Sequence, residues 1–150
     1  MDFIISYLAR YVHIASAITL MGGMFFALLA WLPALQKVGG AGEQSISDAL
    51  AARFRPWFLL AMAGLLLSGF YNYYRHVQHK DVPPLYHMVF GMKFLLALHV
   101  FVVGLLALKG NNTRRRRQIL GVVISGLVII ALSGWMRQLH LSFLLQTVPR

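Results

Sequence analysis

The sequence predicts an all-α integral membrane protein, a four-helix bundle that forms a single domain over residues 1–150. Hydrophobic residues make up 59% of the chain and charged residues only 12%, whereas a soluble domain has about 25% charged residues. Four apolar blocks are each long enough to cross a bilayer, which takes about 20 helical residues. Most charges lie between these blocks, which span residues 4–35, 57–74, 86–108 and 119–139.

The predicted spans are bounded by residues that commonly begin or end helices. Glycine-rich residues 39–42 break the chain after the first span. Ser45 and Ser47 can cap a short amphipathic helix that ends near residue 52. Pro56 then stands at the start of the second span, where its missing N–H costs little. Turn residues precede the last two spans: Asp81, Pro83 and Pro84 before the third, and Asn111 with Asn112 before the fourth.

The basic residues predict the topology, because loops rich in Lys and Arg stay on the cytoplasmic side. Loops 36–56 and 109–118 hold eight Lys and Arg residues, against five on the opposite side. We therefore expect both loops in the cytoplasm and both termini outside. The expected location is the bacterial cytoplasmic (inner) membrane, as a multi-pass protein whose arginine run contacts anionic lipid.

The second and fourth spans end alike, in Ser68-Gly69 and in Ser133-Gly134. Two explanations are open for this similarity. One is a tandem repeat of a helical hairpin. The other is that both helices use small residues so that neighbouring backbones can approach closely.

The composition excludes several kinds of site. The chain has no cysteine, so it holds no disulfide, iron–sulfur cluster, thiolate ligand or covalently attached c-type haem. Its four acidic residues lie in loops or at the N-terminus, so no Ser-His-acid triad can form within the bilayer. A net charge of +10 suggests nucleic acid in a soluble protein, but membrane topology accounts for it here, and we expect no nucleic-acid partner.

Two histidines, His13 and His99, fall inside predicted spans, where ionisable residues are rare and usually functional. His13 is about ten residues into the first span and His99 about thirteen into the third, and both spans enter from the same side. Imidazoles at one level on parallel helices are what bis-histidine ligation of haem b requires. We therefore expect His13 and His99 to bind one haem iron.

Two basic residues near these histidines fit a porphyrin. Arg10 lies one turn from His13 on the same helical face, and Lys93 lies about 9 Å outward of His99. The third span carries no acid, so we expect haem propionates to pair with Arg10 and Lys93. Lys93 and His99 differ by about 120° around an ideal helix, so the lysine must reach sideways to join the same site.

Structural explanations stand beside this one. A histidine in a span can simply bond a neighbouring helix, and a lysine can snorkel to the membrane surface. Gly22 and Gly23 serve either helix packing or the space beside a flat macrocycle. Four further histidines, expected on the outer side, are either interfacial residues or ligands of a second haem, copper(II) or zinc: His76, His79, His87 and His140.

Short motifs with a familiar spacing occur in the first three spans. They are Arg10-Tyr11-Val12-His13, Gly22-Gly23 and Leu32-Pro33, then Arg53-Phe54-Arg55-Pro56 with Leu67-Ser68-Gly69, then Met92-Lys93-Phe94-Leu95-Leu96. This set resembles the HemJ-type protoporphyrinogen oxidases and the related copper-resistance CopD domains. The resemblance implies a haem b bundle with His13 as an iron ligand and Lys93 near the porphyrin or its propionates.

The function expected from these observations is that of a membrane b-type haem protein with one haem b, or two. It carries out electron transfer or haem-dependent oxidoreduction and, if an enzyme, acts on a quinol or a porphyrinogen. The alternatives are a copper-handling membrane protein and a structural subunit of a membrane complex. The expected partners are membrane lipid, a quinone or porphyrinogen, and either another membrane protein or further copies of this chain.

Overall fold

A computed structural model describes residues 2–40, 42–78 and 84–147, and these residues form helices and no strand. Four helical stretches are long and apolar enough to cross a membrane: Phe3–Lys37, Glu43–Arg75, Leu85–Ala107 and Arg115–Trp135. This confirms an all-helical chain with four candidate membrane spans. The elements are α1 (Asp2–Phe26), a π-helical turn η1 (Ala27–Trp31), α2 (Leu32–Val38), α3 (Glu43–Gln78), α4 (Pro84–Ala107) and α5 (Arg115–Thr147).

The second span differs from the prediction, because α3 is one continuous helix. The predicted short helix ending near residue 52 is wrong, and Pro56 lies inside α3. Proline removes one backbone hydrogen bond, to the carbonyl four residues earlier. That carbonyl belongs to an exposed residue ahead of the apolar part of α3, so the helix continues past it. Ser47 is also inside α3, and its side chain is buried in place of the predicted cap.

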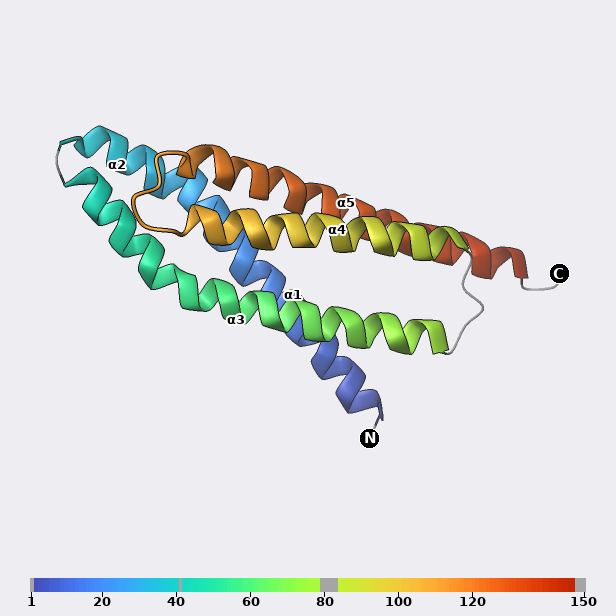
Figure 1. The fold of residues 1–150 in the computed structure, drawn as a ribbon. Helices are drawn as coiled ribbons and strands as arrows, with labels where there is room; N and C mark the ends of the chain where they lie inside the picture. The colour runs from blue at the N-terminus through green and yellow to red at the C-terminus, as the bar shows by residue number, and fades with distance from the viewer. Residues whose placement is uncertain (1, 41, 79–83, 148–150) are drawn as a thin grey trace.

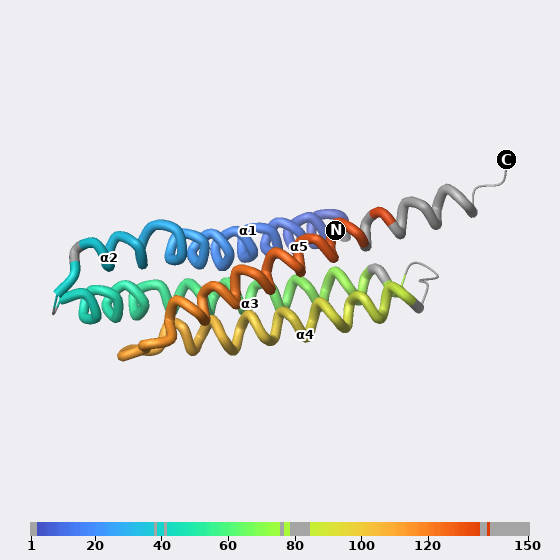
Figure 2. Tube along the Cα trace, turned by 90° about the horizontal axis from the view of Figure 1, so that it is seen from above, coloured from blue at the N-terminus to red at the C-terminus, as the bar shows by residue number. Residues whose placement is uncertain are grey.

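The helices pair as two hairpins (Figure 1). α1 packs along α3, and α4 packs along α5, while α3 and α4 contact each other much less. Seen from above, α5 runs obliquely to the other helices (Figure 2). The bundle is therefore two close pairs joined along limited surfaces, which leaves room between the pairs.

The buried core lies toward the end where α2 and the α4–α5 connection meet. Glycines permit close contacts there: a Cβ at Gly104 would lie 2.3 Å from the ring of Phe58, and one at Gly23 would lie 2.1 Å from the ring of Phe54. The core is made by residues from every helix: Leu20, Met24, Ala27, Trp31, Leu35, Ala51, Phe58, Ala61, Val100, Phe101, Ala107, Leu108, Ile119, Val122 and Val123.

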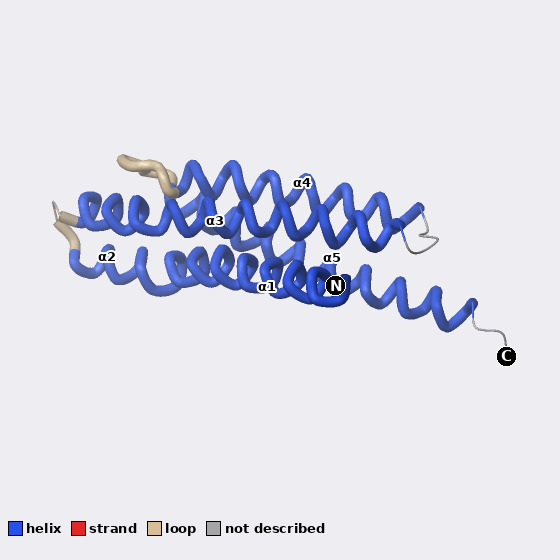
Figure 3. Tube along the Cα trace, turned by 90° about the horizontal axis from the view of Figure 1, so that it is seen from below, coloured by secondary structure: helices blue, strands red, loops and turns tan. Residues whose placement is uncertain are grey.

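A polar cluster also joins the two hairpins at this end, where the described loops lie (Figure 3). Arg115 is 3% exposed and donates hydrogen bonds to the Asp48 carboxylate, at 2.6 Å, and to the Ser47 hydroxyl. Asn111 has a φ of 52° and donates its backbone N–H to Asp48 at 2.9 Å. The two loops that the sequence assigns to one side of the membrane therefore contact each other at one end of the bundle.

Candidate functional site

A cavity of about 1020 Å³ lies between the two hairpins. Ligand pockets commonly measure about 300–1000 Å³, so this one is at the upper end of the range and suits a large ligand. Its walls come from all four long helices and are mainly apolar. The lining residues include Arg10 and His13 from α1, Gly69, Phe70, Tyr73 and Arg75 from α3, Tyr86, Phe90, Lys93 and Phe94 from α4, and Ser133 from α5.

His13 is held by a chain of two hydrogen bonds. Its Nδ1 lies 2.9 Å from the Oγ of Ser68, a buried residue, and that hydroxyl donates to the carbonyl of Gly64 at 2.5 Å. Because the hydroxyl proton is used on the carbonyl, the Ser68 oxygen accepts the proton of Nδ1. Nδ1 therefore carries a proton, and in a neutral imidazole of this form the lone pair is on Nε2.

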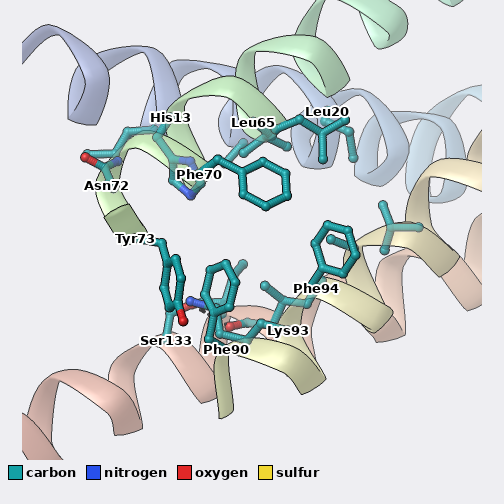
Figure 4. A pocket seen from close by; sticks show the side chains of 18 of the residues that line it. His13, Leu20, Leu65, Phe70, Asn72, Tyr73, Phe90, Lys93, Phe94 and Ser133 are labelled. Atoms are coloured by element: carbon teal, nitrogen blue, oxygen red, sulfur yellow. Dashed lines mark hydrogen bonds between the residues drawn. The ribbon is translucent and has the colours of Figure 1, made fainter. Parts of the chain in front are cut away.

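Glycines in α3 bring α1 close enough for this bond. A Cβ at Gly64 would lie 2.3 Å from the Oγ of Ser16, and one at Gly69 would lie 3.5 Å from the Cε1 of His13. The Cε1–Nδ1 edge of the imidazole thus lies against α3. Figure 4 shows His13 on one side of the cavity and Lys93 with Phe90 on the other.

The cavity has a basic lining. Arg10, Arg75 and Lys93 contribute to its wall, and none of the described lining residues is acidic. In a medium of low dielectric constant, such a set of cations favours a ligand that carries negative charge. Carboxylate groups on an otherwise apolar molecule are the matching chemistry, since most of the remaining lining residues are hydrocarbon or aromatic.

Aromatic rings form the wall between α3 and α4. Tyr73 stacks on Phe90 with ring centroids 3.8 Å apart, and Phe70 packs against Phe94 at 5.6 Å. The Tyr73 hydroxyl also lies 2.8 Å from Nδ1 of His87. These contacts join two helices that otherwise touch little, and they supply flat surfaces for a planar ligand.

The structure brings together Arg10, His13 and Lys93, three of the residues selected from the sequence. His99 is not with them: it is exposed on α4 and does not line the cavity. The expected meeting of His13 with His99 therefore does not occur in this structure. The reason is the 120° between Lys93 and His99 on one helix, which turns the histidine outward when the lysine faces in.

The two glycines selected from the sequence also lie away from the cavity. Gly23 serves helix packing, because the ring of Phe54 occupies the space of its missing side chain. A Cβ added at Gly22 would meet nothing within 4 Å. The proposed role of this pair beside a macrocycle therefore has no counterpart in the packing.

The outer histidines are seen only in part. His87 is exposed and bonded to Tyr73. His79 and the side chains of His76 and His140 lie outside the described residues. Within the described part of the chain, no three side chains of His, Asp or Glu gather as a metal site.

Ser68 and the aromatic wall were not identified as site residues from the sequence. The Leu67-Ser68-Gly69 motif suggested close packing, and it does pack, but its pairing with His13 joins residues 55 positions apart in the chain.

Comparison of the chain with protein-family models, curated proteins and solved structures finds no match.

Proposed function

We propose that this protein binds haem b in the cavity between its hairpins and works as a membrane redox protein. One observation carries the proposal: the Nδ1–H of His13 is held by Ser68, which in the neutral ring would leave Nε2 to bind a metal. Histidines that bind metals nearly always donate their other ring N–H in this way, because the bond orients the ring and raises its basicity.

The other residues that line the cavity also fit a haem. A porphyrin is large, flat and apolar, and it carries two carboxylates. The cavity has the volume, and it has aromatic walls in Tyr73, Phe90 and Phe94. Arg10 and Lys93 are the residues that we assign to the propionates, because no acidic residue among the described lining competes for them.

The residues of the chain then have separate roles. His13 would hold the iron, Ser68 keeps the ring oriented, and the aromatic wall excludes water. Haem would supply a one-electron redox centre within the bilayer. An apolar reductant such as a quinol or a porphyrinogen would reach this cavity from the lipid. This is the activity we propose, in the manner of the HemJ and CopD group.

The proposal includes an orientation. We place loops 36–56 and 109–118 in the cytoplasm of a bacterial cell and both termini outside, on the balance of basic residues. The end of the bundle that contains the cavity then lies toward the outer face of the membrane. We also propose a repeated hairpin on the similar sequences Ser68-Gly69 and Ser133-Gly134, whose serines each donate to the carbonyl four residues earlier in their own helix.

The test is the absorption spectrum of the purified protein, with the haem quantified as its pyridine haemochrome. We expect a Soret band that shifts on reduction with dithionite and about one haem b for each chain. His13→Ala should lose at least nine-tenths of the pigment, and Lys93→Ala should weaken its retention. His99→Ala is the matched control, since this histidine lies outside the cavity and its loss should leave the spectrum unchanged.

Absence of pigment from a folded protein reconstituted with haem would refute the proposal. Retention of the full spectrum by His13→Ala would refute the assignment of the ligand. Metal analysis of the same samples separates the copper-handling alternative, which predicts bound copper without haem.

A further inference from the structure

His99 stands on the face of α4 that points away from the rest of the chain. It is exposed, it does not line the cavity, and it makes no hydrogen bond with the described residues. It lies roughly 22 Å along α4 and about 12 Å from its nearer end, well inside an apolar span. An imidazole in lipid leaves a donor and an acceptor without partners, so polar residues at this depth normally face protein.

The exposed residues around His99 form a regular stripe. They follow one another along α4 at alternating intervals of three and four residues, which is the spacing of the a and d positions in a coiled coil. We call this stripe the His99 face; its members are Leu85, Met88, Met92, Leu95, His99, Val102 and Leu106, all exposed. His99 occupies an a position, with four members of the stripe before it along α4 and two after it.

We propose that a second copy of this chain covers the His99 face, through parallel pairing of the two α4 helices. Copies with the same topology in one membrane are related by a twofold axis along the membrane normal. Their α4 helices then run parallel, and each residue of the stripe meets its own counterpart at the same depth. The His99 face is thus matched to itself residue by residue.

Hydrogen bonding selects this occupant over a helix of another protein. A neutral imidazole carries one donor and one acceptor, so two His99 side chains can bond to each other across the axis. Lipid and ordinary apolar helices offer no such partner. A single polar residue at an a position also fixes the register and the number of helices in a coiled coil.

The proposed dimer leaves the cavity free, because Lys93 faces the cavity from another side of α4. The dimer and the haem site are therefore independent, and each can fail without the other.

The chain has no cysteine, so crosslinking through single introduced cysteines reports one contact at a time. Leu95→Cys lies on the stripe one turn from His99. Leu127→Cys is the matched control: Leu127 is 49% exposed on α5 and lies as far from the α4–α5 connection as Leu95 does. Membranes that contain each full-length variant are oxidised with copper phenanthroline. We expect a product of twice the mass for Leu95→Cys and little or none for Leu127→Cys.

Two further variants test the histidine in the Leu95→Cys background. His99→Leu should lower the crosslinked fraction about threefold, in line with a typical bond between membrane helices. His99→Asn should keep it, because an amide can also bond to its own counterpart. Equal crosslinking at Leu95 and Leu127, no product at Leu95, a product that contains a different protein, or no effect of His99→Leu would overturn the proposal.

Discussion

Replacement of Arg115 by alanine should destabilise the protein by about 3 kcal/mol. Arg115 is one of four consecutive arginines, and it is the buried member, at 3% exposed, while its neighbours are exposed. Its guanidinium donates to the carbonyls of Ala107, at 3.0 Å, and Lys109, at 2.9 Å, and it also bonds to Ser47 and Asp48.

The magnitude follows from what remains after the side chain is removed. Ala107 is fully buried, so its carbonyl loses a partner that water cannot replace. An unpaired buried acceptor costs about 1–3 kcal/mol, and the hydrogen bonds of a charged donor contribute about 1.5–3 kcal/mol each without being additive. A total near 3 kcal/mol is therefore a conservative figure. In a chain of 150 residues it corresponds to a fall in Tm on the order of 10 °C.

The assay is thermal unfolding of the purified protein in a mild detergent, followed by loss of helical circular dichroism. Arg116→Ala is the control, because it removes the same charge from the same run at an exposed position. Its effect should stay within about 0.5 kcal/mol. Equal Tm values for the two variants would show that the arginine run acts only through its charge, and that the cluster around Arg115 does not hold the hairpins together.

Three other outcomes are expected. Ser68→Ala should weaken haem retention about 10- to 100-fold without abolishing it, since the ring of His13 loses its orienting bond; a haem titration of the apoprotein measures this, and an unchanged affinity contradicts the role. Gly23→Ala should cost about 1–3 kcal/mol because an aromatic ring must move, whereas Gly22→Ala, which meets nothing within 4 Å, should leave Tm unchanged. The backbone N–H of Asn111 and the Arg115 guanidinium hold the pKa of Asp48 below its ordinary value, at a site ahead of the apolar part of α3. A lowered pKa contributes stability that is present above the unfolded-state pKa of about 4 and is lost as the pH falls through the folded-state pKa; Asp48→Asn should flatten this acid limb of a Tm-against-pH curve.

The sequence allowed one part of the candidate site to be predicted. Arg10 and His13 are three residues apart, and helical geometry alone puts them on one face. Lys93 was a candidate because a lysine in an apolar span is costly unless it is paired. It does line the cavity. The role of Ser68 could not be predicted from the sequence, because its contact with His13 depends on how α1 and α3 approach each other.

The number and approximate position of the four candidate spans could be read from the sequence by itself. Crossing a bilayer requires a long apolar helix, and such a run is visible in composition and length alone. The boundaries in polar segments could not be read in this way, since α3 continues through Pro56, whose missing hydrogen bond falls on the carbonyl of an exposed residue.

Only the tertiary structure decided which face of each helix looks inward. A membrane helix is apolar on the side that meets lipid as well as on the side that packs, so its sequence lacks the polar face that orients a helix in a soluble protein. His99 and Lys93 were therefore equally good candidates for the interior until packing turned one inward and the other outward. The sequence of the arginine run likewise does not show which arginine is buried. Arg115 is buried because its guanidinium meets the Ala107 carbonyl in the folded chain.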